Sequence, residues 1–161
     1  MAPIEWFEGS RGELADLFAL ADDSPAALRA YRDLGRVLVA RDGTAIIGHL
    51  QLVAGDSGAA EVKSIAVREG RQGAGVGRKL LERAMAVCRE DGLSVLVVAT
   101  AAADVGVLRF YQRLGFRLLR VERDAFTPAA GYPEIEIDGI PLRDRVWLSL
   151  SLGGAAMLGD S

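Results

Sequence analysis

The sequence predicts an α+β domain built on a mainly antiparallel mixed sheet of about seven strands, with about four helices on its faces. Short apolar segments with strand periodicity recur along the chain, and three of them follow one another through tight turns. Amphipathic helical segments separate the others, which gives the order β-α-α-β-β-β-α-β-α-β-β. The 161 residues, 50% hydrophobic and 25% charged, have the composition of one globular domain. We expect this domain to span residues 1–152, and a flexible tail to follow at 153–161.

The first half of the chain carries clear start signals for its elements. Ser10-Arg11-Gly12-Glu13 fits a capping box at the start of one helix, and Ser24-Pro25 is typical of the start of another. The dipeptide Asp42-Gly43 indicates a two-residue hairpin turn. The expected elements are a strand at 4–7, helices beginning after 10 and 24, and strands at 37–41, 44–53 and 61–67.

The second half alternates helices and strands. A helix with one apolar face is expected from about 75 to 91, and a continuous apolar run at Val95–Ala99 is typical of a buried central strand. Asp104 can cap a short helix that Gly115 ends. Strict alternation over Arg145–Leu152 predicts an antiparallel strand with one wet face. A strand is also expected at 116–123, and a long surface loop at 125–142.

Composition excludes several classes of function. Cys88 is the only cysteine and His49 the only histidine, which argues against a disulfide framework and a thiolate or histidine metal site, so no metal is expected. His49 is expected to be structural, and Cys88 to be a packed thiol. With 19 basic and 22 acidic residues, the net charge of −3 does not favour nucleic-acid binding. The longest uncharged run is shorter than the ~20 residues of a membrane span, and no signal peptide is recognised. A cytoplasmic location is the resulting expectation.

A glycine-rich stretch at residues 70–77 follows a predicted strand and opens a predicted helix. Glycines let a ligand approach the backbone, and the free N–H groups of a helix N-terminus attract phosphate. A Walker A loop is excluded because Val76 stands where its lysine belongs, and a dinucleotide fingerprint because Arg78 fills its third glycine position. The stretch therefore predicts a different phosphate ligand.

Two segments carry a resemblance to a known family. Gln72–Gly77, QGAGVG, resembles the acetyl-CoA loop of the GNAT N-acetyltransferase superfamily, which has the pattern Q/R-x-x-G-x-G/A. Asp104–Phe116 resembles that family's segment ending in F-Y-x-K/R-L-G-F. The resemblance covers roughly residues 37–123 and the last strand. It implies a GNAT-like sheet with splayed central strands, and an enzyme that uses acetyl-CoA as co-substrate.

The resemblance also implies which residues bind the cofactor. The edge of the strand at Ile65, Ala66 and Val67 would hold the pantetheine arm, and the Val67 N–H could hold the thioester oxygen. Asp104 stands where the family often has asparagine. An ionised aspartate cannot donate a hydrogen bond, so its contact with the cofactor would differ. The residues implied for the pyrophosphate are Gln72, Gly73, Ala74, Gly75, Val76, Gly77 and Arg78.

Two residues match catalytic positions of the family. Tyr111 matches the general acid that protonates the departing CoA thiolate, although Leu108, Tyr111 and Leu114 share a helix face, as core residues would. Glu61 stands six residues before Val67, where some histone-type members have a general base. The alternatives to that role are a solvated glutamate at a strand end, with water or another carboxylate as base.

The resemblance implies an N-acetyltransferase that moves the acetyl group to a primary amine by direct attack in a ternary complex. A small-molecule acceptor is favoured; a peptide or protein acceptor and a non-catalytic acyl-CoA-sensing module are the alternatives. A homodimer is left open. Glu134, Glu136 and Asp138 could guide a cationic acceptor, or could belong to a merely solvated loop.

Overall fold

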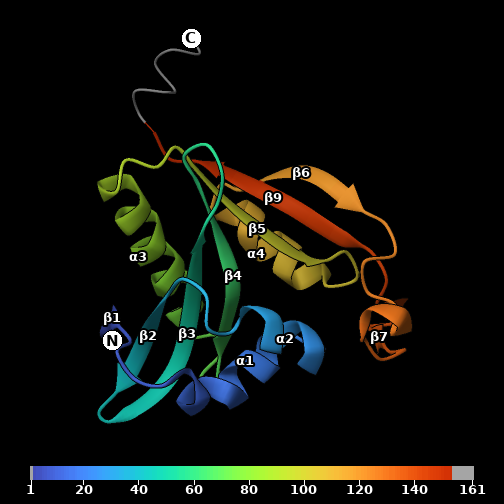
Figure 1. Ribbon diagram of the computed structural model, residues 1–161, viewed down its shortest axis with the longest axis horizontal. Coiled ribbons are helices and arrows are strands. Elements are labelled where there is room, and N and C mark those ends of the chain that lie inside the picture. The colour runs from blue at the N-terminus through green and yellow to red at the C-terminus, as the bar shows by residue number, and fades with distance from the viewer. Residues whose placement is uncertain (1, 154–161) are drawn as a thin grey trace.

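A seven-stranded mixed sheet organises the chain, with strand order β1-β2-β3-β4-β5-β9-β6 (Figure 1). This computed structural model describes residues 2–153, so the expected tail at 153–161 lies, apart from Gly153, outside the described residues. The strands of this sheet are β1 (Ile4–Trp6), β2 (Arg36–Asp42), β3 (Ala45–Ala54), β4 (Ala59–Val67), β5 (Val95–Ala101), β6 (Arg117–Glu122) and β9 (Arg145–Ser151). The described α-helices are α1 (Ala15–Ala21), α2 (Pro25–Tyr31), α3 (Val76–Glu90) and α4 (Val105–Arg113). The α+β prediction is confirmed.

The two central strands separate along their length. β4 and β5 pair in parallel only from Ala59↔Val95 to Val62↔Val98, whereas every other neighbouring pair in the sheet is antiparallel. β4 then continues to Val67 beside β3, while β5 continues beside β9. Figure 1 shows the two strands diverging. The predicted splay of the central strands is therefore present.

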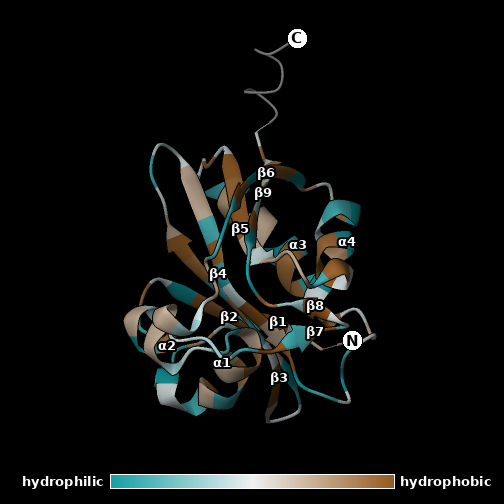
Figure 2. Cartoon of the chain, turned by 90° about the vertical axis from the view of Figure 1, so that its right-hand side faces the viewer, coloured by the Kyte–Doolittle hydropathy of each residue, from teal (hydrophilic) through white to brown (hydrophobic). Residues whose placement is uncertain are grey.

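Helices cover both faces of the sheet. α3 and α4 pack on one face, where Leu80 and Leu81 are fully buried. α1 and α2 cover the other face, where Phe18 packs with Val37 and Val39. β5 is hydrophobic along its length (Figure 2), as its continuous apolar run predicted. Among residues 2–153, no helix has the length and apolar character needed to cross a bilayer.

Two details of the turns differ from the sequence predictions. The first hairpin turns at Gly43–Thr44, one residue later than expected, and only Gly43 has a positive φ, 63°. The expected loop at 125–142 contains a 3-10 turn, η2 (Pro128–Ala130), and a small ribbon of β7 (Glu136–Ile137) and β8 (Ile140–Pro141). Asp138 and Gly139 both have positive φ, 49° and 83°, which is the geometry of an Asp-Gly hairpin turn. The sequence analysis did not predict this turn, because the three prolines of the segment favoured an irregular loop.

Candidate active site

A cavity of about 230 Å³ opens where β4 leaves β5. The floor includes Glu61, Val62 and Lys63 of β4, together with Ala99 and Thr100 of β5. The α1–α2 corner, the 126–142 segment and β9 form the walls. Because the two strands no longer bond to each other here, a ligand can enter between them.

Carboxylates from three parts of the chain reach this cavity. They are Asp22 and Asp23 at the α1–α2 corner, Glu61 on β4, and Asp104 at the start of α4. The Asp104 carboxylate also caps α4, because the Val107 N–H donates to it at 3.2 Å. Glu61 and Asp104, both expected at the site, are thus brought to one cavity.

Two cations line the same cavity. The Lys63 ammonium lies 3.8 Å from the Glu61 carboxylate and 4.9 Å from the centre of the Tyr31 ring. The Arg145 guanidinium donates to Glu122 at 3.1 Å. The cavity is therefore lined by both negative and positive side chains. The sequence analysis did not predict that Lys63 and Arg145 line it.

Two tyrosines close one wall around Asp22. The Tyr31 hydroxyl donates to the Asp22 carboxylate at 2.8 Å, and burial followed by that negative charge raises the pKa of Tyr31. Burial, then the charge of Asp22, raises the pKa of Tyr132 to about 12. Both phenols are therefore neutral donors near physiological pH. Asp22 of the α1–α2 corner and Tyr132 of the 126–142 segment line the same cavity.

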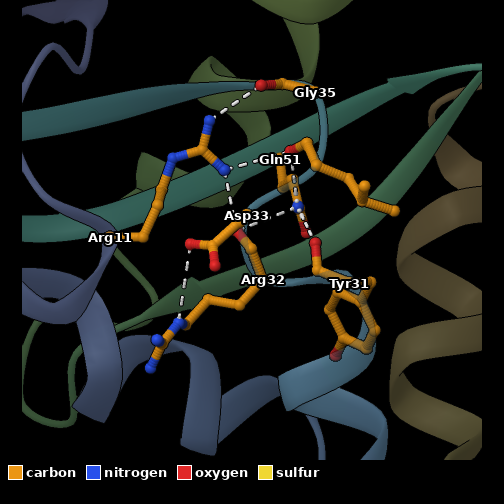
Figure 3. Close-up of polar contacts among 7 residues, drawn as sticks. Arg11, Tyr31, Arg32, Asp33, Gly35 and Gln51 are labelled. Carbon is orange, nitrogen blue, oxygen red and sulfur yellow. Dashed lines mark hydrogen bonds and ion pairs between the residues drawn. The ribbon is translucent and has the colours of Figure 1, made fainter.

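A set of hydrogen bonds holds α2, and with it Tyr31, against the cavity (Figure 3). The fully buried Gln51 side chain donates to the carbonyls of Tyr31 and Leu34 at 2.8 and 2.9 Å. The Arg11 guanidinium donates to the carbonyls of Arg32 and Leu34 at 2.7 and 3.0 Å. A helix leaves its last carbonyls unpaired, and these two side chains satisfy carbonyls at the end of α2 and in the turn that follows it.

The glycine loop lies at the junction of β4 and α3. Gly73 and Gly75 have φ of 84° and 85°, and a Cβ at either position would meet no atom within 4 Å. Gly75 is the N-cap of α3, whose first turn has no side-chain cap and no acidic residue. Its free N–H groups and the positive end of the helix can therefore receive an anion. Of the expected loop residues, Gln72, Gly73, Ala74, Gly75 and Arg78 are exposed, Gly77 is half-buried, and Val76 is buried.

The outer end of β4 offers a free backbone edge. The Arg68 N–H donates to the Ile47 carbonyl of β3 at 2.9 Å. Because backbone groups alternate along a strand, the N–H groups of Val67 and Ile65 point away from β3, and that of the intervening Ala66 points toward it. The Gln72 side chain donates to the Val67 carbonyl at 3.0 Å, in agreement with that orientation. The edge can pair with an extended ligand.

Tyr111 lies behind the cavity rather than in its lining. Its side chain is 3% exposed, and its ring packs between those of Phe110 and Phe116, each 5.4 Å away. Burial, and then the negative charge of Asp104, raises the pKa of Tyr111, so the phenol stays protonated.

Other residues considered from the sequence lie outside the cavity lining. His49 is fully buried, 2.8 Å from the Ser64 hydroxyl, and burial lowers its pKa to about 3. The carboxylates of Glu134, Glu136 and Asp138 are exposed, and the 126–142 segment contributes Tyr132 and Ile137 to the lining instead. The expectation that those three carboxylates guide an acceptor therefore loses its structural basis.

The sequence matches the acetyltransferase (GNAT) family over residues 4–116. It is 32% identical over 150 residues to the uncharacterized N-acetyltransferase YvbK of Bacillus subtilis (strain 168), a match that covers 92% of this chain and 96% of that protein. The uncharacterized protein YxbD of the same organism is 36% identical over 78 residues, which is 46% of this chain and 49% of that protein.

Solved structures resemble the whole fold. An IAA acetyltransferase from Bacillus cereus ATCC 14579 superposes with a TM-score of 0.86 at 33% identity, over 94% of this chain and 100% of that chain. A Bacillus subtilis acetyltransferase in complex with CoA gives a TM-score of 0.86 at 30% identity, over 95% and 100% of the chains. A GNAT family acetyltransferase from Elizabethkingia anophelis with acetyl-CoA bound gives 0.86 at 29% identity, over 93% and 97%. The chain therefore belongs to the acetyltransferase (GNAT) family and is an acyltransferase.

Proposed function

We propose that the protein transfers the acetyl group of acetyl-CoA to a primary amine of a small molecule, by direct attack in a ternary complex. The observation that carries this proposal is the succession of three features along β4. They are the uncapped N-terminus of α3, the edge of β4 that does not pair with β5, and the cavity lined by charged side chains. These features suit a pyrophosphate, an extended amide chain and an amine, in that order. The CoA and acetyl-CoA complexes of two structural relatives support the same donor.

The donor would bind along β4. Its pyrophosphate takes the N–H groups of residues 72–78, and its pantetheine arm pairs with the edge from Ile65 to Val67. The thioester then reaches the cavity at Lys63. The Ile65 N–H, two residues nearer to the cavity than that of Val67, is the better placed donor for the oxyanion that forms at the carbonyl.

The chemistry would begin with removal of a proton from the acceptor ammonium by Glu61, directly or through one water. The amine nitrogen attacks the carbonyl carbon, and the tetrahedral intermediate collapses as the C–S bond breaks. The CoA thiolate leaves, and the second proton of the amine nitrogen passes to water, so that the amide product is neutral. Tyr111 donates a hydrogen bond to that sulfur. Because a thiol has an ordinary pKa near ~8.5 and the pKa of Tyr111 is raised, the phenol stabilises the thiolate mainly as a hydrogen-bond donor.

A thiol-release assay with acetyl-CoA and a panel of primary amines tests the proposal. Turnover with a small amine, together with acetyl-CoA binding measured by calorimetry, is the expected result. Binding without turnover of any amine would favour the non-catalytic acyl-CoA-sensing alternative. Turnover by Glu61→Gln and Tyr111→Phe equal to that of the wild-type protein would remove these two residues from the mechanism and leave the transfer reaction in place. Turnover of peptides alone would replace the small-molecule acceptor with a peptide.

A further inference from the structure

Lys63 sits at the point where β4 changes from two neighbouring strands to one. The register between β3 and β4 shifts here, because Leu52 pairs with Val62 and Gln51 with Ser64. Lys63 is therefore an extra residue in the strand, and such bulges re-aim side chains. Its side chain lines the cavity together with that of Glu61.

The Lys63 ammonium and the Glu61 carboxylate do not form a close hydrogen bond with each other. The 3.8 Å between the ammonium nitrogen and the carboxylate oxygen is longer than a charge-assisted hydrogen bond, ~2.7–2.9 Å. The side chains are 34% and 23% exposed. An ammonium has three donors and a carboxylate about four acceptor positions, so each partner retains capacity for a ligand.

Arg145, the other cation of the cavity, is already neutralised. Its guanidinium donates to Glu122 at 3.1 Å and lies 4.8 Å from the centre of the Phe126 ring. Trp147 also donates to Glu122, at 3.2 Å, which fixes that carboxylate. Lys63 is therefore the cation of the cavity that is better able to bind an incoming anionic group.

We infer that Lys63 selects the acceptor, and that the preferred acceptor is a small zwitterion of the amino-acid class, with an anionic group within a few bonds of the reacting amine. This inference rests on the proposed function. The acceptor's ammonium faces Glu61, which takes its proton, and its carboxylate faces the Lys63 ammonium. A simple amine would bring the same ammonium to Glu61 but no negative charge to the Lys63 ammonium, so it would lack this second attraction. The cavity of about 230 Å³ suits an acceptor of that size.

The test compares amino acids with their carboxamides, which keep the amine and lose the negative charge. We would measure kcat/KM for CoA release with glycine, L-alanine and the other proteinogenic amino acids, and with β-alanine, each beside its amide. Values are corrected for the unprotonated fraction of each amine. The wild-type protein should prefer the better amino acids over their amides by about tenfold or more, since one charge-assisted hydrogen bond contributes that much. In Lys63→Met this ratio should fall to about one.

The ratio separates recognition from structural damage, because a general loss of activity affects both members of a pair. Lys63→Arg should keep the preference. Arg83→Met, which removes one positive charge from the exposed face of α3, should leave the ratio unchanged. Calorimetric titration of the same pairs into CoA-saturated protein gives a second readout that does not need turnover.

A preference that persists in Lys63→Met would overturn the role of Lys63. A wild-type protein that acetylates simple amines or amides better than amino acids would overturn the acceptor class, while leaving the proposed acetyl transfer intact. Failure of acetyl-CoA to bind would overturn the proposed function, and this inference with it.

Discussion

Gly75→Glu gives the sharpest test of the pyrophosphate site. The new side chain would stand at the N-cap of α3, where φ is 85° and a Cβ meets no protein atom within 4 Å. The space is therefore available, and only a ligand would oppose the side chain. A carboxylate about 5 Å from each phosphate repels each by about 0.8 kcal/mol in water, and by about 3 kcal/mol at an effective dielectric constant of 20. Since the loop is exposed, the lower value applies, and two phosphates give about 1.5 kcal/mol or more.

That repulsion corresponds to an affinity for acetyl-CoA at least about tenfold weaker. The same change also introduces backbone strain, about 1–2 kcal/mol for a side chain in the left-handed region, which should lower Tm by a few degrees. Gly70→Glu is the matched control, because its φ is 83°, its Cβ also meets no atom within 4 Å, and it precedes the predicted loop. A thermal melt should show a similar decrease in Tm for both variants. Calorimetry should show that only Gly75→Glu loses most of its affinity for acetyl-CoA. Equal affinities in the two variants would refute the placement of the pyrophosphate.

Four further predictions follow from named contacts. Tyr111→Phe should lower kcat by about 10²-fold with little change in the Kd for acetyl-CoA, because the departing thiolate loses a hydrogen-bond donor, and an unchanged kcat under conditions where chemistry limits would remove Tyr111 from the reaction. Gln51→Leu should raise KM for the acceptor more than it lowers kcat, because α2 and Tyr31 lose their anchoring hydrogen bonds; a change in Tm alone would make Gln51 purely structural. The triple variant Glu134→Gln, Glu136→Gln, Asp138→Asn should keep the parent KM, since these side chains are exposed outside the cavity lining; a raised KM would restore their role. His49 has a folded-state pKa of about 3 against an ordinary 6.5, so the unfolded chain binds more protons between these values; Tm should fall as pH drops from 6.5 toward 3, and less steeply in His49→Gln.

Local signals predicted the fold well and the cavity poorly. Capping residues, the glycine loop and the apolar run of β5 each act within a few neighbouring residues. Ser24, Gly75 and the strand at Val95–Ala99, which the structure extends to Ala101, could therefore be assigned from the sequence. The cavity joins the α1–α2 corner, β4 and β9, which approach each other only through long-range pairing. No sequence pattern near Asp22 or Arg145 indicates that these two residues line the same cavity. Lys63 left one trace, as one of only two lysines, but no local pattern separates it from a solvated residue.

The bulge at Lys63 explains why the charged side chains of Glu61 and Lys63 and the unpaired backbone N–H groups of β4 occur next to each other. Side chains alternate along a strand, so Glu61 and Ser64 would face opposite sides of a regular β4. The extra residue brings both to the α1–α2 side, where Glu61 lines the cavity and Ser64 bonds to His49, which packs against Phe18. Without the bulge, either Glu61 would enter the α3 core or Ser64 would leave its buried partner. The irregularity therefore lets one strand present a charged pair before the splay and an unpaired edge, from Ile65 onward, after it.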